Sequence, residues 1–237
     1  RKFDCRDPAT ETSYGSKLGF ASSHREALDR IGAGARVVDL GAGEAPVAAA
    51  LIAKGCKVTG IDRRRPDTEI AFDRFIEHDL GEALPAAVFD GADVVLVLDV
   101  VDHLGDPEAF VDDLHANESL SGATDILVNT GNVAFGPTRI CLSFGMFNYG
   151  KQGILDRTHT RLFTFSTLCR LFEQAGFDVV EQKGIPAPFA LALRRQWIAA
   201  ALSAVNRAGI RLWPGFFAYE VFLRVRKRPT LTDLLGH

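Results

Sequence analysis

The segment from Arg36 to Asp62 constrains the fold of this chain more than any other part of the sequence. A short apolar run, Val37 to Leu40, is typical of a strand that is buried on both faces. Gly41-Ala42-Gly43 follows at once, and then a stretch of Ala, Val, Leu and Ile from Ala45 to Ala53. Gly55 ends this stretch, since glycine enters the left-handed C-cap conformation without penalty. The segment therefore predicts a strand, a glycine turn and a helix.

A second strand, Lys57 to Ile61, ends on Asp62 and completes a nucleotide-binding half-domain. Asp62 lies about 20 residues after Gly41, where a carboxylate can accept hydrogen bonds from both hydroxyls of a ribose. Because Gly41 and Gly43 lack side chains, the backbone can approach a ligand that lies over the helix N-terminus. The pattern thus predicts a nucleotide ligand.

Two details argue against a pyrophosphate ligand. Asp39 precedes the first glycine inside the strand, and Pro46 stands where Gly-x-Gly-x-x-Gly would have its third glycine. A dehydrogenase normally needs that glycine and has no use for an acid at this place. A ligand with an amino-acid end and no phosphate fits better, because Asp39 can orient the loop or reach an ammonium group through water.

These residues resemble motif I and the following acid of class I S-adenosylmethionine-dependent methyltransferases, whose usual pattern is acid-x-Gly-x-Gly-x-Gly. Ala45 replaces the last of these glycines. The resemblance covers roughly Phe20 to Arg228. It implies a Rossmann-like α/β fold, a seven-stranded and mostly parallel sheet of order 3-2-1-4-5-7-6 with helices on both faces. Its cofactor would be S-adenosylmethionine. A nucleotide-binding fold of another kind, or one that binds nothing, is the alternative.

The resemblance also assigns residues to the cofactor. They are Asp39, Gly41, Ala42, Gly43, Asp62, Arg63, Asp79, Leu80 and Asp99. Asp79 follows an expected third strand, Phe72 to Glu77, and matches the family's acid that meets the adenine amine; it is alternatively a loop acid that caps the next turn. Residues 1–16 are polar and aperiodic and predict a loose arm. Lys17 to Ile31 predicts a helix, and the resemblance implies that this helix covers the cofactor, with Tyr14 or Phe20 either closing over it or simply packing.

Asp99 to Leu104 resembles the family's motif IV and follows a buried strand, Ala92 to Leu98. Open α/β sheets bind ligands at the carboxyl ends of their strands, so we expect Asp99 to face the cleft. His103 either orients this loop or acts on the substrate. A helix should begin after Asp106, which has the features of an N-cap, and run to about Ser119.

The ends of two strands carry residues that suggest a metal site. Thr124 to Asn129 reads as the fifth strand, and Asp99 and Asn129 fall where metal-dependent catechol-type methyltransferases carry ligands. Magnesium needs several convergent oxygen ligands, and Thr130 stands where a further one would be expected. We therefore expect methyl transfer without a metal.

Residues 131–163 are long and poor in periodicity, which in a compact domain indicates a functional insertion. We expect it to form the acceptor side of the site. Its second half, Asp156 to Thr164, resembles the text that precedes the last major helix in many small-molecule and sugar methyltransferases. Tyr149, Asp156 and Arg161 are the expected acceptor-binding residues. His159 is ranked above His103 as the base, because histidine suits proton transfer near neutral pH; it alternatively ties the insertion to the sheet.

The last third of the chain predicts a helix, a strand, a basic helical segment and a final strand. Phe165 to Ala175 has helical apolar spacing and Phe177 to Gln182 reads as the sixth strand.

Residues 185–212 form the basic helical segment, within a region from 185 to 228 that holds eight basic side chains and one acid. Its uncharged run, Gln196 to Asn206, is shorter than the ~20 residues that span a bilayer. It is either a core-covering helix with an arginine rim or an interfacial helix on anionic lipid, with 190–211 as the contact. Gly215 to Val225 should insert antiparallel as the last strand.

Composition limits the remaining possibilities. The 237 residues, 47% hydrophobic, suffice for a single domain over 1–237. The net charge of −3 indicates no general affinity for nucleic acid. The four cysteines show no metal spacing and no signal peptide is visible, so we expect reduced thiols in the cytoplasm, with contact to the inner membrane left open.

The expected function is methyl transfer from S-adenosylmethionine to a small-molecule or glycan acceptor, at oxygen. The sequence of the insertion also resembles that of methyltransferase domains that are joined to family-two glycosyltransferases in bacteria. That resemblance implies a glycan or glycolipid acceptor and a partner domain before Arg1. Two alternatives remain: a non-catalytic cofactor-binding module of a larger chain, and an NAD-dependent oxidoreductase.

Overall fold

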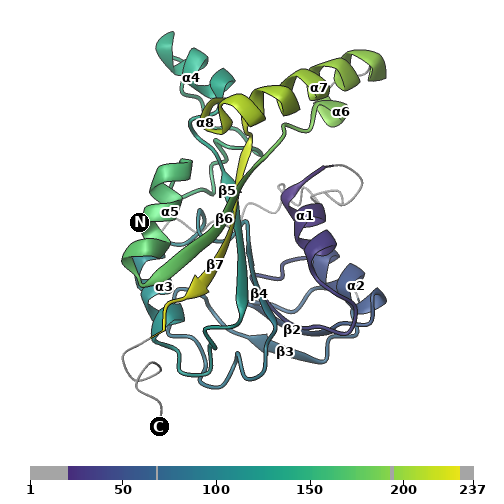
Figure 1. Cartoon of the computed structure of the whole chain (residues 1–237), viewed down its shortest axis with the longest axis vertical. Coiled ribbons are helices and arrows are strands. Elements are labelled where there is room, and N and C mark those ends of the chain that lie inside the picture. Colours follow the sequence, from purple (N-terminus) through teal and green to yellow (C-terminus); the bar gives the residue numbers. More distant parts are fainter. Residues whose placement is uncertain (1–20, 68, 193–194, 230–237) are drawn as a thin grey trace.

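A computed structural model of the chain describes residues 21–67, 69–192 and 195–229, which build one seven-stranded sheet covered by helices (Figure 1). The strand order is β3-β2-β1-β4-β5-β7-β6, which confirms the predicted order. The strands are β1 Arg36–Leu40, β2 Lys57–Asp62, β3 Arg74–Glu77, β4 Val94–Leu98, β5 Asp125–Gly131, β6 Phe177–Ile185 and β7 Glu220–Lys227.

All pairings among β1 to β5 are parallel, and β7 runs antiparallel between β5 and β6, as expected. Parallel strands must be joined by crossover connections, which here are mostly helical. The carboxyl ends of β1 to β5 consequently meet at one edge of the sheet. Because β7 begins beside the ends of β5 and β6, the long connection between β6 and β7 reaches the same edge.

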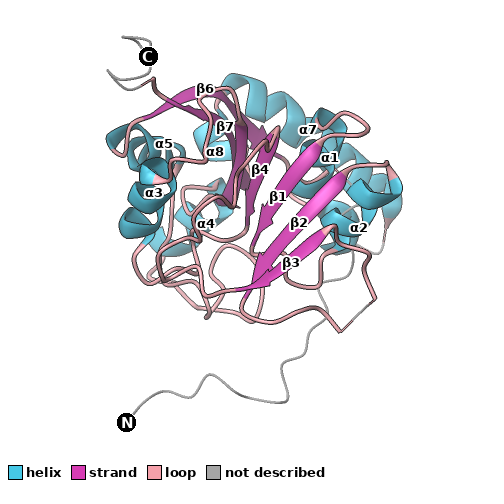
Figure 2. Ribbon diagram, turned by 90° about the horizontal axis from the view of Figure 1, so that it is seen from below, coloured by secondary structure: helices cyan, strands magenta, loops and turns pink. Residues whose placement is uncertain are grey.

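Helices cover both faces of the sheet. Helices α1 (Ser23–Arg30) and α2 (Pro46–Ala53) lie on one face, and α3 (Pro107–Ala116) and α5 (Phe165–Gln174) lie on the other (Figure 2). Alternate side chains of a strand point to opposite faces. Val38 of β1 accordingly joins the core under α3 and α5, whereas Val37 joins the core under α1 and α2. This double burial accounts for the unbroken apolar runs of the central strands.

Four further helices form a cap at the carboxyl edge of the sheet (Figure 1). Helix α4 (Gly136–Ser143) follows β5, and α6 (Phe189–Ala192), α7 (Gln196–Leu212) and α8 (Pro214–Phe217) connect β6 to β7. Asn206 anchors α7 from its inner side, since its amide donates to the Phe217 carbonyl at 2.7 Å and accepts from the Ala187 amide. None of the helices in the described part of the chain is long and apolar enough to cross a membrane.

Several helix ends follow the sequence signals. Asp106 accepts a hydrogen bond from the Ala109 amide at 2.9 Å and so caps α3, as predicted. Thr164 and Thr167 form a reciprocal capping box at the start of α5. Gly176, with φ of +98°, ends that helix because the left-handed conformation suits glycine.

Other boundaries differ from the prediction. The leading helix begins at Ser23, not at Lys17, because the Ser22 side chain accepts from the Arg25 amide and caps it there. The last strand begins at Glu220, not at Gly215, because Pro214 starts the short helix α8. The insertion at 131–163, which is poor in periodicity, contains the helix α4.

Two more elements are longer or shifted. Strand β6 continues to Ile185 along its partner β7, beyond the predicted end at Gln182. The basic helical segment predicted for 185–212 contains α6 and α7, and α7 runs to Leu212. The expected loose arm, Tyr14 and Phe20 lie outside the described residues.

Candidate active site

The glycine turn after β1 is bound to the end of β2. The amides of Gly41 and Ala42 donate to the Ile61 carbonyl, and the Asp62 carboxylate accepts from the Gly43 amide at 2.8 Å. Gly43 has a φ of +54°, and a Cβ at this position would meet only the Gly41 carbonyl oxygen, at 3.9 Å. The backbone over the start of α2 is therefore open to a ligand at Gly43.

Gly41 is needed for a different reason than the sequence suggested. A Cβ at Gly41 would lie 2.6 Å from Cγ2 of Val100, in the loop after β4. Its φ of +77° also lies in the left-handed region. The missing side chain thus allows two loops of the protein to pack together, whereas only Gly43 leaves space on the outside.

Carboxylates gather where β1, β2 and β4 end. Asp39 is buried, and this burial raises its pKa to about 7, with a further rise from Asp62 and an opposing effect of His24. His24 Nε2 lies 3.2 Å from Asp99 Oδ2. Asp39 is repelled by Asp62, and one histidine, His24, acts on both Asp39 and Asp99. An added positive charge at this site would relieve both the repulsion and the cost of desolvation.

Asp99 is held in an uncommon backbone conformation. Its φ is +53°, and it is fixed by Asn129, whose amide group donates to Asp99 Oδ1 at 2.8 Å and accepts from the Asp99 amide at 3.2 Å. Strained residues of this kind persist where their surroundings determine them fully. Asn129, considered at the outset as a metal ligand, is buried and uses both ends of its amide to position Asp99.

His24 was missed in the sequence because it belongs to no motif. It lies on α1, the helix expected to cover the cofactor, and reaches Asp99 from above the sheet. The helix is fastened by Arg30, whose guanidinium makes two hydrogen bonds of 2.7 Å to the Glu181 carboxylate of β6. The one sequence signal for His24 was its place at the start of the helix expected to cover the cofactor, and therefore near the acids at the strand ends.

The residues expected around adenine lie at the next strand end. Asp79 Oδ1 accepts from the Gly81 amide at 2.9 Å and from Arg63 Nη2 at 3.0 Å. The backbone bond from Gly81, followed by the bond from Arg63, lowers the pKa of Asp79, so this carboxylate is ionised. Leu80 is buried in the core. Asp79 therefore caps its own turn.

A second polar centre joins the loop after β4 to the end of the insertion. Thr160 donates from its amide to the Asp102 carbonyl at 2.8 Å, and its hydroxyl shares its one proton between the Asp102 and Leu104 carbonyls. His159 Nε2 lies 3.4 Å from Asp102 Oδ2, and the His103 and His159 rings meet edge to face at 4.8 Å. The loop after β4 and the end of the insertion, far apart in the sequence, are thus hydrogen-bonded to each other around the buried Asp102.

The protonation of this centre follows from its partners. His159 Nδ1 lies 3.0 Å from the Ile154 carbonyl, which can only accept, so Nδ1 carries a proton. Burial, and then the nearby Asp99, raise the pKa of Asp102, while the two histidines oppose the rise. Asp102 Oδ2 and His159 Nε2 face each other inside the protein. The His159 side chain is only 9% exposed, and both of its ring nitrogens face protein groups.

His103 is placed differently. Its ring is exposed, and Nδ1 lies 3.3 Å from the Thr158 carbonyl, to which it donates. Nε2 then carries the lone pair, and it has no hydrogen-bond partner among the described residues. Of the two candidate bases, His103 is the one that offers a basic nitrogen to the outside of the centre.

The three expected acceptor residues have different surroundings, and the backbone next to Tyr149 is bridged to Asp156 through Gly150. Asp156 is buried, and its Oδ1 accepts from the amide and the hydroxyl of Thr158, both at 2.8 Å, which shapes the turn before His159. Arg161 is exposed and makes a two-pronged ion pair with Glu108 of α3. Tyr149 is exposed on the insertion.

One group of side chains in the described structure has the composition of a metal site. Asp102, His103 and His159 each offer a ligand atom, and these atoms lie within 4.8 Å of one another. Both rings turn Nδ1 toward a backbone carbonyl, which is how metal-bound histidines are commonly held. The same arrangement also serves a proton-transfer pair.

Comparison with known proteins identifies the family. A family model described as "Methyltransferase domain" matches residues 17–182, more than half of the chain. The chain is also 28% identical, over 169 residues, to the ubiquinone biosynthesis O-methyltransferase of Cupriavidus pinatubonensis. That match covers 65% of this chain and spans 64% of the length of the relative.

Solved structures share the fold. One is the 1,6-didemethyltoxoflavin-N1-methyltransferase of Burkholderia thailandensis with bound S-adenosylhomocysteine, at a TM-score of 0.54 and 16% identity, covering 89% of this chain and 80% of that one. Another is an S-adenosylmethionine-dependent methyltransferase of Archaeoglobus fulgidus, at 0.55 and 17%, covering 89% and 97%. At these identities the likeness concerns the fold alone.

The buried carboxyl of Asp39 should leave a signature in the pH dependence of stability. Its pKa is about 7 in the folded protein and about 3.9 in an unfolded chain, so the native state holds the extra proton between these values. Ionisation therefore costs stability as the pH rises from about 4 to 7. Asp39→Asn removes this cost, and its melting temperature relative to the parent should rise over that range. For Asp67→Asn, at an exposed acid, the difference in melting temperature from the parent should not change with pH. A difference for Asp39→Asn that is also independent of pH would contradict the raised pKa of Asp39.

Substitution of Gly41 should separate backbone strain from steric overlap. Gly34 has nearly the same φ, +79°, but nothing within 4 Å of an added Cβ, so Gly34→Ala introduces strain alone, of about 1–2 kcal/mol. Gly41→Ala adds the overlap with Val100, worth a further ~1–3 kcal/mol in the free energy of unfolding. Denaturant titration measures both variants, and Val100→Ala should recover part of the loss. Equal losses at Gly34 and Gly41 would rule out the packing explanation.

Proposed function

The chain belongs to the methyltransferase domain family, and on that premise we propose that it transfers the methyl group of S-adenosylmethionine to a hydroxyl oxygen of its acceptor. The observation that carries the proposal is the pairing of two polar centres at one sheet edge. Acids at the ends of β1, β2 and β4 suit a positively charged nucleoside, and His103 beside them offers a basic nitrogen.

The residues present fit this cofactor. Asp62 supplies carboxylate oxygens for the ribose hydroxyls, and the open backbone at Gly43 allows close approach. Asp79 is ionised and suited to the adenine amine. Asp39 and Asp99 are suited to the positively charged amino-acid end, which would relieve the desolvation of Asp39. When bound, the sulfonium supplies a methyl group that is already activated for transfer.

The protein's own task is then to align the acceptor and to remove its proton. We assign that proton to Nε2 of His103, because the Nδ1 bond to the Thr158 carbonyl fixes the tautomer that leaves Nε2 basic. The nearby Asp102 stabilises the imidazolium that results. His159, which ranked first on sequence grounds, becomes a positioning residue that holds Asp102 and the insertion in place.

Transfer without a metal remains our proposal. An activated methyl group needs no Lewis acid, and the acceptor hydroxyl needs only a base. A metal-assisted reaction is the competing mechanism, because Asp102, His103 and His159 could also hold a divalent cation. Chelation distinguishes the two.

The acceptor is proposed at the level of its reacting group. The O-methyltransferase similar to this chain supports oxygen as the methylated atom, and the chain spans 64% of that relative's length. We further propose that the acceptor is a small molecule or a glycan. The resemblance to fused bacterial methyltransferases suggests, more specifically, a glycolipid acceptor and a partner domain before Arg1. A cofactor-binding module without catalysis would bind S-adenosylmethionine but release no S-adenosylhomocysteine with any phenolic or glycan acceptor. An oxidoreductase would instead bind NAD in calorimetry.

Cofactor affinity should depend on Asp62. Asp62→Ala removes two charge-assisted hydrogen bonds, each worth roughly 1.5–3 kcal/mol, so the dissociation constant measured by calorimetry should rise about 100-fold or more. Asp67→Ala, a nearby exposed acid, is the matched control and should leave it unchanged. Because Asp62 also holds the Gly43 amide, Asp62→Asn, which keeps an acceptor for that amide, separates loss of the turn from loss of the ribose contact. A loss below tenfold for Asp62→Ala would contradict the placement.

The two histidines should fail in different ways. His103→Gln should keep cofactor affinity and lower turnover by roughly 10²–10⁴, the usual contribution of a general base. His159→Gln should lower the melting temperature and raise the Michaelis constant for the acceptor, while turnover at saturation persists. The parent's rate should decline as the pH falls below neutral, because a protonated histidine cannot accept the proton.

These variants are assayed with tritiated cofactor and the best acceptor from a panel of phenols and glycans. A His103→Gln variant with near-normal turnover, combined with an inactive but stable His159→Gln variant, would return the role of base to His159. Chelator-treated enzyme is run in parallel. Activity that disappears on chelation and returns with a divalent cation would replace the base mechanism by a metal-assisted one at the same three residues.

A further inference from the structure

The exposed apolar side chains of the molecule are concentrated on its cap. Among the described residues, every exposed large hydrophobic side chain except Val180 lies either in α4 and the segment after it or in α7 and its C-terminal neighbour. We call this surface the apolar cap face; it consists of Ile140, Leu142, Phe144, Met146, Phe147, Tyr149, Trp197, Leu202, Val205, Leu212 and Trp213. Apolar surface gathered in this way indicates an interaction site, because scattered hydrophobic residues would not cluster on two segments.

Helix α7 presents its apolar stripe to the outside. Trp197, Val205 and Leu212 are 71%, 65% and 87% exposed, and with the exposed Ala201 and Ala208 they recur at spacings of three and four residues, on one side of a helix. The opposite side is buried against α8 and the segment after β6 through residues such as Ala199 and Gly209. A helix that covers a core normally turns its polar side outward, so the outward side of α7 is adapted to an apolar environment.

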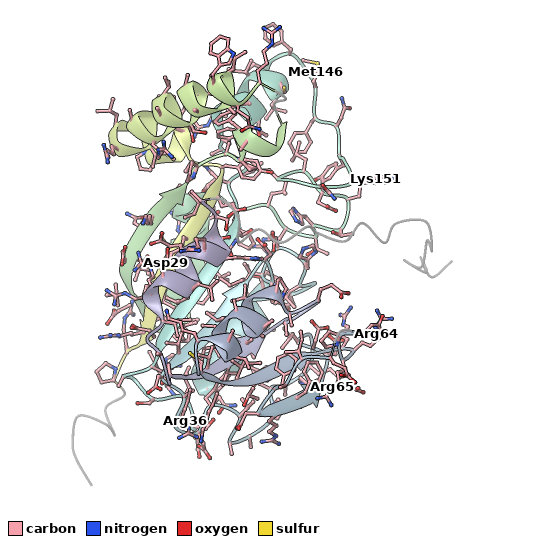
Figure 3. All side chains as sticks on the ribbon, turned by 90° about the vertical axis from the view of Figure 1, so that its right-hand side faces the viewer. Asp29, Arg36, Arg64, Arg65, Met146 and Lys151 are labelled. Carbon is pink, nitrogen blue, oxygen red and sulfur yellow. The ribbon has the colours of Figure 1, made fainter. Side chains whose placement is uncertain are left out.

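The two segments form one continuous surface. The Arg139 guanidinium of α4 lies over the Trp213 ring at 5.9 Å and over the Phe216 ring at 5.8 Å. Asn132, just before α4, donates to the Ala218 carbonyl at 2.8 Å and to the Gly215 carbonyl. Figure 1 shows α4, α7 and α8 together at one end of the molecule, and Figure 3 places Met146 at this end, far from Arg64 and Arg65.

The charge of the cap selects the partner. The stretches 132–155 and 186–219 contain no aspartate or glutamate, although the chain as a whole carries a net charge of −3. Their exposed charged residues in the described structure are all basic: Arg139, Lys151, Arg195, Arg207 and Arg211. Arg207 and Arg211 follow the edge of the apolar stripe of α7. An apolar stripe edged by arginines matches the boundary of an anionic bilayer, where acyl chains lie beneath phosphate groups.

We propose that the apolar cap face binds the surface of an anionic phospholipid bilayer. The side chains of Trp197, Leu212 and Phe144 enter the boundary between head groups and acyl chains, and Arg207 and Arg211 pair with lipid phosphates. The protein lies on the membrane by this face. The insertion at 131–163 carries part of the face at one end and His159 at the other, so contact with the bilayer orients the candidate active site toward it.

The tryptophans make the proposal directly measurable. The chain has two, Trp197 and Trp213, and both lie on the apolar cap face, so tryptophan fluorescence reports on this surface alone. With vesicles of phosphatidylcholine and phosphatidylglycerol, the emission should shift to the blue and should be quenched by brominated acyl chains. Vesicles of phosphatidylcholine alone should give a much weaker effect, and added salt should reduce the binding.

Matched variants separate charge from apolar contact in a vesicle flotation assay. Arg207→Glu combined with Arg211→Glu should lower partitioning onto anionic vesicles by at least about tenfold, since each basic residue near the surface contributes about fivefold. Arg64→Glu combined with Arg65→Glu makes the same change in net charge at the opposite end and should bind as the parent does. Trp197→Asp combined with Val205→Asp should also abolish flotation, whereas Val180→Asp, on an exposed apolar residue of β6, should not.

The outcomes decide the proposal without reference to catalysis, because no cofactor or acceptor is needed. Unchanged emission with anionic vesicles would overturn it, as would equal losses for the two arginine pairs. A blue shift that grows with protein concentration in the absence of lipid, with elution as a dimer, would show that a second copy covers the face instead. Melting curves of all variants confirm that the compared proteins are folded.

Discussion

Parallel pairing of the first five strands is the constraint on which the rest of the structure depends. It forces each strand to end at the same edge and each connection to return across a face of the sheet. Short polar segments after β1, β2 and β4, separated by tens of residues in the chain, therefore become neighbours. The antiparallel β7 extends the effect, since it brings the connection from β6 to the same edge. Ligand site, histidine pair and cap share one end of the molecule for this reason.

The buried and partly buried acids at that edge are stabilised as groups, and their partners come from elsewhere in the chain. Asp99 is secured by Asn129 of the neighbouring strand and by His24 of α1. Asp102 is enclosed by His159 and by the segment that follows it. Such groups are costly to bury unless they are paired, so their surroundings are built to fix them. The raised pKa of Asp39 shows that the cost of burying this carboxylate is not fully compensated. A positively charged ligand therefore gains the most binding free energy beside Asp39.

The insertion at 131–163 links the chemistry to the outer surface. Its start forms α4 and an apolar, exposed segment, and its end supplies the turn of Asp156 and the ring of His159. A single connection therefore contributes both to the pair of Asp102 and His159 and to the surface at the cap. Loops at the carboxyl edge of a rigid sheet can vary in this way, because the strands and the covering helices supply most of the core.

The sequence by itself determined the strands and helices of the central sheet, because unbroken apolar runs, the glycine turn after Leu40 and the caps at Asp106 and Gly176 are local signals. The strand order followed from the resemblance to class I methyltransferases. It also indicated which strand ends carry acids. Only the tertiary structure decided which groups meet: that His24 reaches Asp99, that Gly41 serves packing against Val100, and that His159 turns inward while His103 remains accessible. It also decided that the apolar side of α7 faces outward. Periodicity reports that a helix has an apolar side, but the direction of that side follows from what the neighbouring elements bury.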